Sequence, residues 1–195
     1  MKGKRPVGTV CICFEKPGKR NTGAVLAAAG ERAGTLGIAT VLVPSVSGKT
    51  ALAAREALAK NIRVVAVTHV AGFEGPDIQD MGARARRLLE SKGVPVLTAQ
   101  HAFGGLGRAV RNKLGTYQVD EIMAWTLRTF GQGTKVAVEI ALMAADAGLV
   151  RTGEDVISLG GSGEGVDTAL VVRPSNSSRF FDLKVREVIC KPRNF

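Results

Sequence analysis

The sequence is poor in aromatic residues, which make up 5% of its 195 residues, and it has no long apolar run. No stretch reaches about 18 uninterrupted apolar residues, so no membrane-spanning helix is expected. The basic N-terminus is not followed by the long apolar segment of a signal peptide, so none is expected. The length excludes a complete (β/α)₈ barrel, which needs roughly 250 residues. With 45% hydrophobic residues, the chain is expected to form a single globular domain over residues 1–195.

Cysteine is scarce as well, since the chain contains only Cys11, Cys13 and Cys190. An odd number without the spacing of a disulfide framework indicates a reduced protein, which we expect in the cytoplasm. Cys11 and Cys13 are two residues apart and would share one face of a strand, which is not the spacing of a zinc knuckle. We interpret all three cysteines as small core residues.

Acidic residues are the minority, and the net charge is +10. The excess lies at the two ends. Residues 1–20 hold six Lys or Arg against one acid, and residues 173–195 hold six against two. The segment between them is nearly neutral. We interpret the basic ends as solubilising surface charge, with nucleic-acid binding as the alternative.

Apolar patterns along the chain alternate between strand and helix. The expected strands cover residues 7–14, 39–43, 63–67, 94–98, 156–159, 168–172 and 184–190. The expected helices cover residues 22–36, 50–60, 79–92, 119–130 and 135–148, and a further short helix ends at residue 114. This alternation predicts a three-layer, doubly wound α/β domain with a mostly parallel sheet, to which the last strands add an antiparallel hairpin.

Four loops leave the carboxyl ends of the first four expected strands, at residues 16–22, 45–50, 68–73 and 100–108. Each contains glycine together with hydroxyl, amide, imidazole or cationic side chains. In an open parallel sheet, ligands bind at this rim, where the strand order reverses. The rim is therefore the expected functional site.

The strongest single motif is Pro44-Ser-Val-Ser-Gly-Lys-Thr50, between a strand and a helix. Its serines, glycine and threonine offer hydroxyl and backbone N–H donors at a helix start, and Lys49 adds a positive charge. We predict that this loop binds a phosphate. The alternative is a plain helix cap formed by Ser45 or Ser47. The segment is not a P-loop, because Val43 stands where that motif requires glycine.

Other polar segments leave more than one interpretation open. Gly160-Gly-Ser-Gly-Glu-Gly165 lies between two expected strands, which favours a hairpin connection that can fold over a ligand.

His69 and His101 lack metal-ligand spacing, so no metal is expected. Either histidine can contact a ligand, act as acid or base, or be solvated. Glu139 and Asp146 share a helix face, and we favour ion pairs with Lys or Arg over catalysis.

Several of these segments resemble the C-terminal domain of pyruvate kinase. Residues 45–50 are similar to its loop for the phosphate of a sugar-bisphosphate effector, residues 147–161 to its last helix–turn–strand, and residues 163–169 to its effector-loop hairpin. A closer resemblance, over nearly the whole chain, is to a small family of stand-alone pyruvate kinase α/β-domain-like proteins. The segments that carry it are Lys16-Pro-Gly with Asn21-Thr22, Gly72-Phe73, Gly105-Leu-Gly-Arg108, residues 139–148, Gly160-Gly with Asp167-Thr-Ala169, and Cys190-Lys-Pro-Arg193.

Members of that family carry FMN and have no established reaction. The resemblance therefore implies an FMN-binding protein, with flavin-dependent oxidoreduction as the class of activity and without pyruvate kinase activity. It implies a flavin phosphate on the loop formed by Ser45, Val46, Ser47, Gly48, Lys49 and Thr50. The position of the other rim loops would then place the ribityl chain and flavin among Asn21, Thr22, His69, Gly72, Phe73 and Arg108. Lys49 and Gly107 stand where relatives often carry an acid, which makes this site more positive.

The alternative function is a non-catalytic sensor of a phosphorylated metabolite or nucleotide. In both cases the expected partner is FMN or another phosphorylated small molecule, not a nucleic acid or a membrane. The sequence leaves the oligomeric state open, including a homo-oligomer.

Overall fold

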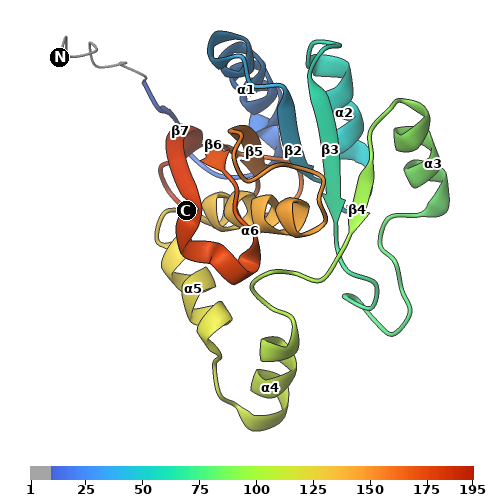
Figure 1. The fold of residues 1–195 in the computed structure, drawn as a ribbon, viewed down its shortest axis with the longest axis vertical. Helices are drawn as coiled ribbons and strands as arrows, with labels where there is room; N and C mark the ends of the chain where they lie inside the picture. Colours follow the sequence, from blue (N-terminus) through green and yellow to red (C-terminus); the bar gives the residue numbers. More distant parts are fainter. Residues whose placement is uncertain (1–9) are drawn as a thin grey trace.

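The computed structural model describes residues 10–195, and in this part of the chain the strands form one seven-stranded sheet (Figure 1). The strands are β1 (Ile12–Phe14), β2 (Thr40–Pro44), β3 (Arg63–Thr68), β4 (Val96–Thr98), β5 (Val156–Gly160), β6 (Thr168–Arg173) and β7 (Lys184–Pro192). The helices are α1 (Thr22–Leu36), α2 (Lys49–Ala57), α3 (Ala83–Ser91), α4 (Leu106–Leu114), α5 (Val119–Arg128) and α6 (Gln132–Asp146). Two 3₁₀ helices, η1 (Lys19–Asn21) and η2 (Ser177–Asp182), complete the described elements.

The strand order is β1-β7-β6-β5-β2-β3-β4. All neighbouring strands pair in parallel except β6, which is antiparallel to both β5 and β7. The order reverses between β2 and β5, because β3 and β4 extend the sheet to one side of β2 and the later strands extend it to the other. The predicted mostly parallel α/β sheet with an antiparallel C-terminal hairpin is confirmed.

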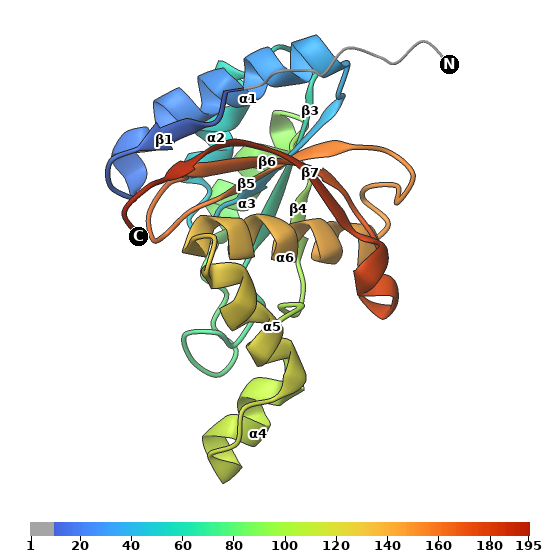
Figure 2. The ribbon, with the colours of Figure 1, turned by 90° about the vertical axis from the view of Figure 1, so that its left-hand side faces the viewer.

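Helices cover both faces of the sheet, with α1 on one side and α6 on the other (Figure 2), and each face has its own apolar core. Val41 and Val43 of β2 pack with α1, α2 and α3 on one face, whereas Leu42 packs with α6 on the other. Because successive side chains of a strand point to opposite faces, a continuous apolar run is what a strand covered on both faces requires. Helix α6 is buried along most of its length, which explains its apolar, alanine-rich sequence.

Helices α4 and α5 extend away from the sheet, below α6 in Figure 2. No residue of α4 is buried, and Leu106, Val119 and Trp125 of this helical pair expose more than half of their surface. The segment begins directly after the rim loop that contains His101, so it belongs to the same end of the molecule as the candidate site.

Besides smaller shifts in the bounds of β1, α2, β4 and α6, two sequence predictions differ from the structure. Cys190 is buried, but Cys13 is exposed and Cys11 is only partly buried, so the prediction of three core cysteines is wrong. The reason is that β1 is an edge strand that pairs with β7 alone. Helix α3 begins at Ala83 rather than at residue 79, because the side chains of Gln79 and Asp80 bond to His69 in the preceding loop.

Part of the predicted first strand, residues 7–9, lies outside the described residues. The same is true of much of the basic N-terminal end. Among the described residues, no helix has the length and apolar character needed to cross a membrane.

Candidate functional site

The loop between β2 and α2 presents backbone N–H groups at the start of a helix. Ser45 is buried, and its Oγ accepts a hydrogen bond from the N–H of Ala51 at 3.2 Å, which fixes the first turn of α2. Within residues 10–195, the N–H groups of residues 47–50 have no hydrogen-bond partner. Four free N–H groups at a helix start, added to the positive end of the helix dipole, favour an anion.

This loop opens into a cavity of about 690 Å³ at the carboxyl ends of the strands. The cavity lies at the point where the strand order reverses, between the loops that follow β2 and β5. It therefore occupies the ligand position typical of open α/β sheets. Its lining comes from five segments far apart in the chain: Lys19, Thr22, Pro44, Val46, Ser47, Lys49, Thr50, Ala53, His69, Gln132, Val136, Gly161, Gly163, Glu164 and Gly165.

The charge of the cavity is set by two lysines and one glutamate. The Nζ of Lys19 lies 2.7 Å from the Oε2 of Glu164, and this exposed pair joins the loop after β1 to the β5–β6 hairpin. The hydrogen bond from Lys19 lowers the pKa of Glu164, and the charge of Lys49 adds to this effect. Lys49 itself is exposed and forms no ion pair with any residue from 10 to 195. Its charge is therefore available to a ligand.

The β5–β6 hairpin is held against the loop after β1 by a buried carboxylate. Asp167 is fully buried, and its Oδ2 accepts hydrogen bonds from the N–H of Gly18 at 3.0 Å and of Ser162 at 3.1 Å. The N–H of Val166 donates to the Oγ1 of Thr22 at 3.1 Å. The predicted hairpin connection at residues 160–165 is thus present and forms one wall of the cavity.

Of the predicted site residues, Thr22, Val46, Ser47, Lys49, Thr50 and His69 line the cavity. Ser45, Asn21, Gly48 and Gly72 shape the surrounding loops instead. The Nδ2 of Asn21 donates to the carbonyl of Lys16 at 2.9 Å, and the N–H of Gly72 donates to the carbonyl of Ile78 at 2.8 Å.

Gly48 has a packing role. Its φ is +87°, and a Cβ at this position would lie 3.1 Å from the Cβ of Ala85 in α3. Glycine is needed here because the backbone is left-handed and the missing side chain points at α3. A substitution at Gly48 would therefore disturb helix packing before it reached the cavity.

Phe73 and Arg108 lie beside the cavity, in an aromatic cluster with both histidines. The rings of Phe73 and His101 are stacked with centroids 5.0 Å apart, and the guanidinium of Arg108 lies 5.0 Å from the centroid of Phe73. The ring of His69 is 4.1 Å from that of Phe73. His69 thus lies in both the cavity wall and the cluster.

A buried ion pair lies next to His101. Lys135 and Glu139 of α6 are bonded to each other, and the Oε1 of Glu139 accepts the N–H of Phe103 at 3.0 Å. Burial lowers the pKa of Lys135. The predicted ion pair of Glu139 with a lysine is confirmed. The ion pair predicted for Asp146 is wrong: this residue is exposed at the end of α6, where it accepts the N–H of Ser177 at 2.9 Å.

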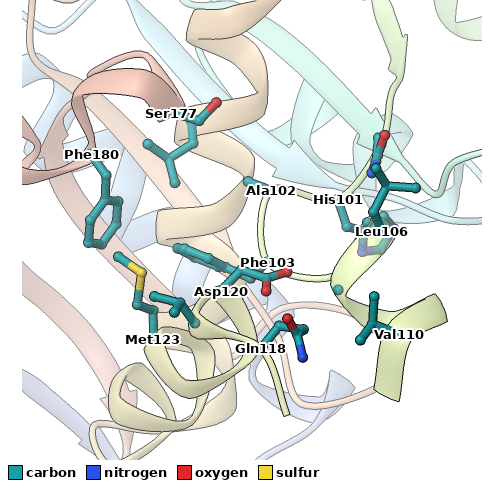
Figure 3. Close-up of a pocket in the computed structure, with 15 residues that line it drawn as sticks. His101, Ala102, Phe103, Leu106, Val110, Gln118, Asp120, Met123, Ser177 and Phe180 are labelled. Atoms are coloured by element: carbon teal, nitrogen blue, oxygen red, sulfur yellow. The ribbon is translucent and has the colours of Figure 1, made fainter. Parts of the chain in front are cut away.

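A second cavity, of about 650 Å³, lies between the 100–107 loop, α4, α5 and η2 (Figure 3). Its walls are mostly apolar and include Phe103, Met123 and Phe180. His101 borders this cavity, and its Nε2 is buried without a hydrogen-bond partner in the described chain. Burial lowers the pKa of His101 to about 4, so the imidazole is neutral at pH 7.

Gln132 and Val136 of α6 are among the cavity residues that the sequence did not predict. No local signal identifies them, because they reach the site only when the amino end of α6 packs over β5 and β6. Helix α6 lies very close to β5 here, since a Cβ on Gly160 would lie 1.8 Å from the carbonyl oxygen of Gly133.

A protein family and a solved structure are similar to this chain. The family model described as pyruvate kinase, alpha/beta domain, matches residues 23–172. A solved structure, Cryptosporidium parvum pyruvate kinase in complex with ADP, is similar at 15% sequence identity with a TM-score of 0.39. The similarity covers 81% of this chain and 24% of that chain, so this protein corresponds to about a quarter of that enzyme's length. Because the family model matches well over half of its residues, the chain belongs to the pyruvate kinase alpha/beta domain family.

Proposed function

We propose that the cavity at the carboxyl rim binds a phosphorylated small molecule, and that this molecule is FMN, held by its phosphate on residues 45–50. The observation that carries the proposal is the run of N–H groups at residues 47–50, where α2 begins, which have no hydrogen-bond partner within residues 10–195. Three of these residues, Ser47, Lys49 and Thr50, line the cavity. A phosphate satisfies these donors and is attracted by the helix end and by Lys49.

The rest of the cavity suits a flavin mononucleotide. A volume of about 690 Å³ lies within the usual range for cofactor sites. Pro44, Val46, Ala53 and Val136 provide an apolar wall for a ring system. Thr22, Gln132 and His69 offer hydrogen bonds for a ribityl chain. Bound FMN supplies hydride or single-electron transfer, and flavin-dependent oxidoreduction is the class of activity that we propose.

The first test is to purify the protein without added flavin and to record its visible absorption spectrum. We expect a yellow protein whose colour is lost on reduction with dithionite. A colourless protein that binds no flavin, but melts at higher temperature with a sugar phosphate, would replace this proposal with the alternative, a sensor of a phosphorylated metabolite.

The second test isolates the phosphate contact. FMN and riboflavin differ by the phosphate alone, so calorimetric titration of both measures what the loop contributes. We expect riboflavin to bind at least about tenfold more weakly than FMN, in keeping with charge-assisted hydrogen bonds. Lys49→Gln should weaken the binding of FMN by roughly tenfold and leave the affinity for riboflavin unchanged.

Lys60→Gln is the matched control, because Lys60 is an exposed lysine just beyond the opposite end of α2. It should leave both affinities unchanged. Equal affinity of the wild-type protein for FMN and riboflavin would show that the phosphate does not lie on this loop.

A further inference from the structure

A cluster of potential metal ligands lies beside the rim cavity, in the loop between β3 and α3. His69, Glu74 and Asp80 each present one nitrogen or oxygen atom, and these atoms all lie within 4.8 Å of one another. We propose that these three side chains bind a zinc ion. This site is separate from the phosphate loop and does not depend on the flavin proposal.

The charges of the cluster favour a cation. Glu74 and Asp80 bring two carboxylates together in a protein whose net charge is +10. Among residues 10–195, neither carboxylate forms an ion pair with a lysine or arginine. The side chain of Asp80 is only 7% exposed, and its single polar partner in this range is His69. Burying a carboxylate beside a second one is costly unless a positive charge compensates, and a divalent cation would neutralise both.

Local hydrogen bonds hold His69 and Asp80 close together, and Glu74 lies on the same loop. The N–H of Gly72 donates to the carbonyl of Ile78 at 2.8 Å, which closes the loop and returns Asp80 to the vicinity of His69. The Nε2 of Gln79 donates to the carbonyl of His69 at 3.1 Å. The ring of Phe73 packs against the imidazole. The cluster is therefore assembled before any ion arrives, which lowers the cost of binding.

The donor set points to zinc. One imidazole nitrogen with two carboxylate oxygens is a ligand set that zinc accepts, with water in the fourth position. The Nδ1 of His69 and the Oδ2 of Asp80 are now joined at 2.6 Å. In a tetrahedral zinc site ligand atoms lie roughly 3.4 Å apart, so binding requires a shift of less than 1 Å between these side chains. Three protein ligands leave one coordination position open beside a cavity that His69 also lines.

Sequence analysis expected no metal, because His69 and His101 lack ligand spacing along the chain. Glu74 and Asp80 are 5 and 11 residues from His69, and only the closure of this loop brings them together.

The test is calorimetric titration of untagged, flavin-free protein with zinc chloride. It uses a Cys11→Ser/Cys13→Ser background, because thiols near the N-terminus also bind zinc. We expect one zinc ion per chain, and at least about tenfold weaker binding in Glu74→Gln and in Asp80→Asn. Asp77→Asn is the matched control. It removes an exposed carboxylate from the same loop, at a left-handed φ of 61° that asparagine tolerates.

Glu74 is exposed, so Glu74→Gln should fold normally even if the buried change Asp80→Asn does not. The absence of saturable zinc binding by the parent protein would overturn the proposal. Unchanged zinc affinity in Glu74→Gln would also overturn it. Since no flavin is present, either result leaves the phosphate-loop proposal untouched.

Discussion

Among single residues, the buried partners Lys135 and Glu139 are expected to be sensitive to substitution. Both side chains are buried, and the Nζ of Lys135 also lies 5.8 Å from the ring centroid of Phe103. Glu139→Gln leaves the ammonium group without its counter-ion in a dry environment. We expect this change to lower the free energy of unfolding by about 3 kcal/mol, measured by urea denaturation.

An exposed pair in the same chain provides the comparison. Arg151 and Glu154 lie 3.5 Å apart, with 85% and 67% of their side chains exposed. Glu154→Gln should change stability by less than about 0.5 kcal/mol, because water screens the pair. Similar losses in the two variants would show that burial does not govern the cost of losing the carboxylate.

The residues that sequence analysis predicted best are those whose role is local. The helix cap by Ser45, which was the alternative to phosphate binding, is present, because Ser45 lies only six positions before Ala51 and their bond forms within a single turn and helix start. The ion pair of Glu139 with Lys135 is equally local, at four residues along one helix. Gln132 and the exposure of Cys13 were missed, because both depend on which elements pack together.

At the level of helices and strands, the contact of α6 with the sheet controls the shape of the cavity. Gly133 lies where α6 crosses β6, and a Cβ there would lie 2.1 Å from the Oγ1 of Thr168. Gly133→Ala should push α6 away from the sheet and lower the free energy of unfolding by about 2 kcal/mol. Because Gln132 and Val136 line the cavity, the same variant should also weaken FMN binding.

Gly34→Ala is expected to have the opposite effect on stability from Gly133→Ala. Gly34 is exposed in α1, and a Cβ there meets nothing within 4 Å. Alanine should raise stability by about 0.5–1 kcal/mol, because it restricts the unfolded chain and suits a helix. Equal effects of the two substitutions in thermal melts would contradict the tight contact of α6 with β6.

The helices and strands could be predicted because each follows from a local pattern of apolar and polar residues. The continuous apolar runs of β2 and β3 reflect burial on both faces, and Gly37 ends α1 in a left-handed conformation that glycine adopts readily. The start of α3 was not predictable, because its first expected turn is taken up by bonds from Gln79 and Asp80 to His69. Those bonds belong to the tertiary structure of the rim.

For the molecule as a whole, the strand order is what converts four separate loops into one site. The alternation of strands and helices predicts parallel pairing, but several orders satisfy it. The observed order places the loops after β1, β2, β3 and β5 around one cavity, with the β5–β6 hairpin held by Asp167. The general position of the site at the carboxyl rim followed from the fold class. The residues that line the cavity could not be predicted without knowing the order of the strands.

Protonation of His101 should contribute to the pH dependence of the free energy of unfolding. Burial lowers the pKa of this side chain from 6.5 to about 4, against a smaller opposing effect of Glu139. Between these values the unfolded chain binds a proton that the folded protein does not. Above pH 6.5, the neutral His101 side chain should not reduce the free energy of unfolding. As the pH is lowered from about 6.5 to about 4, the free energy of unfolding should therefore fall by at most about 3 kcal/mol.

Urea denaturation at several pH values between 7 and 4 tests this expectation. Other groups also titrate in this range, so the informative quantity is the difference in slope between the wild-type protein and His101→Gln. Glutamine cannot gain the proton in either state, and stability of the variant should fall less steeply with acidification. Parallel pH profiles for the two proteins would mean that His101 is protonated equally well in the folded and unfolded states. The neutral, buried imidazole beside the second cavity would then not exist in solution.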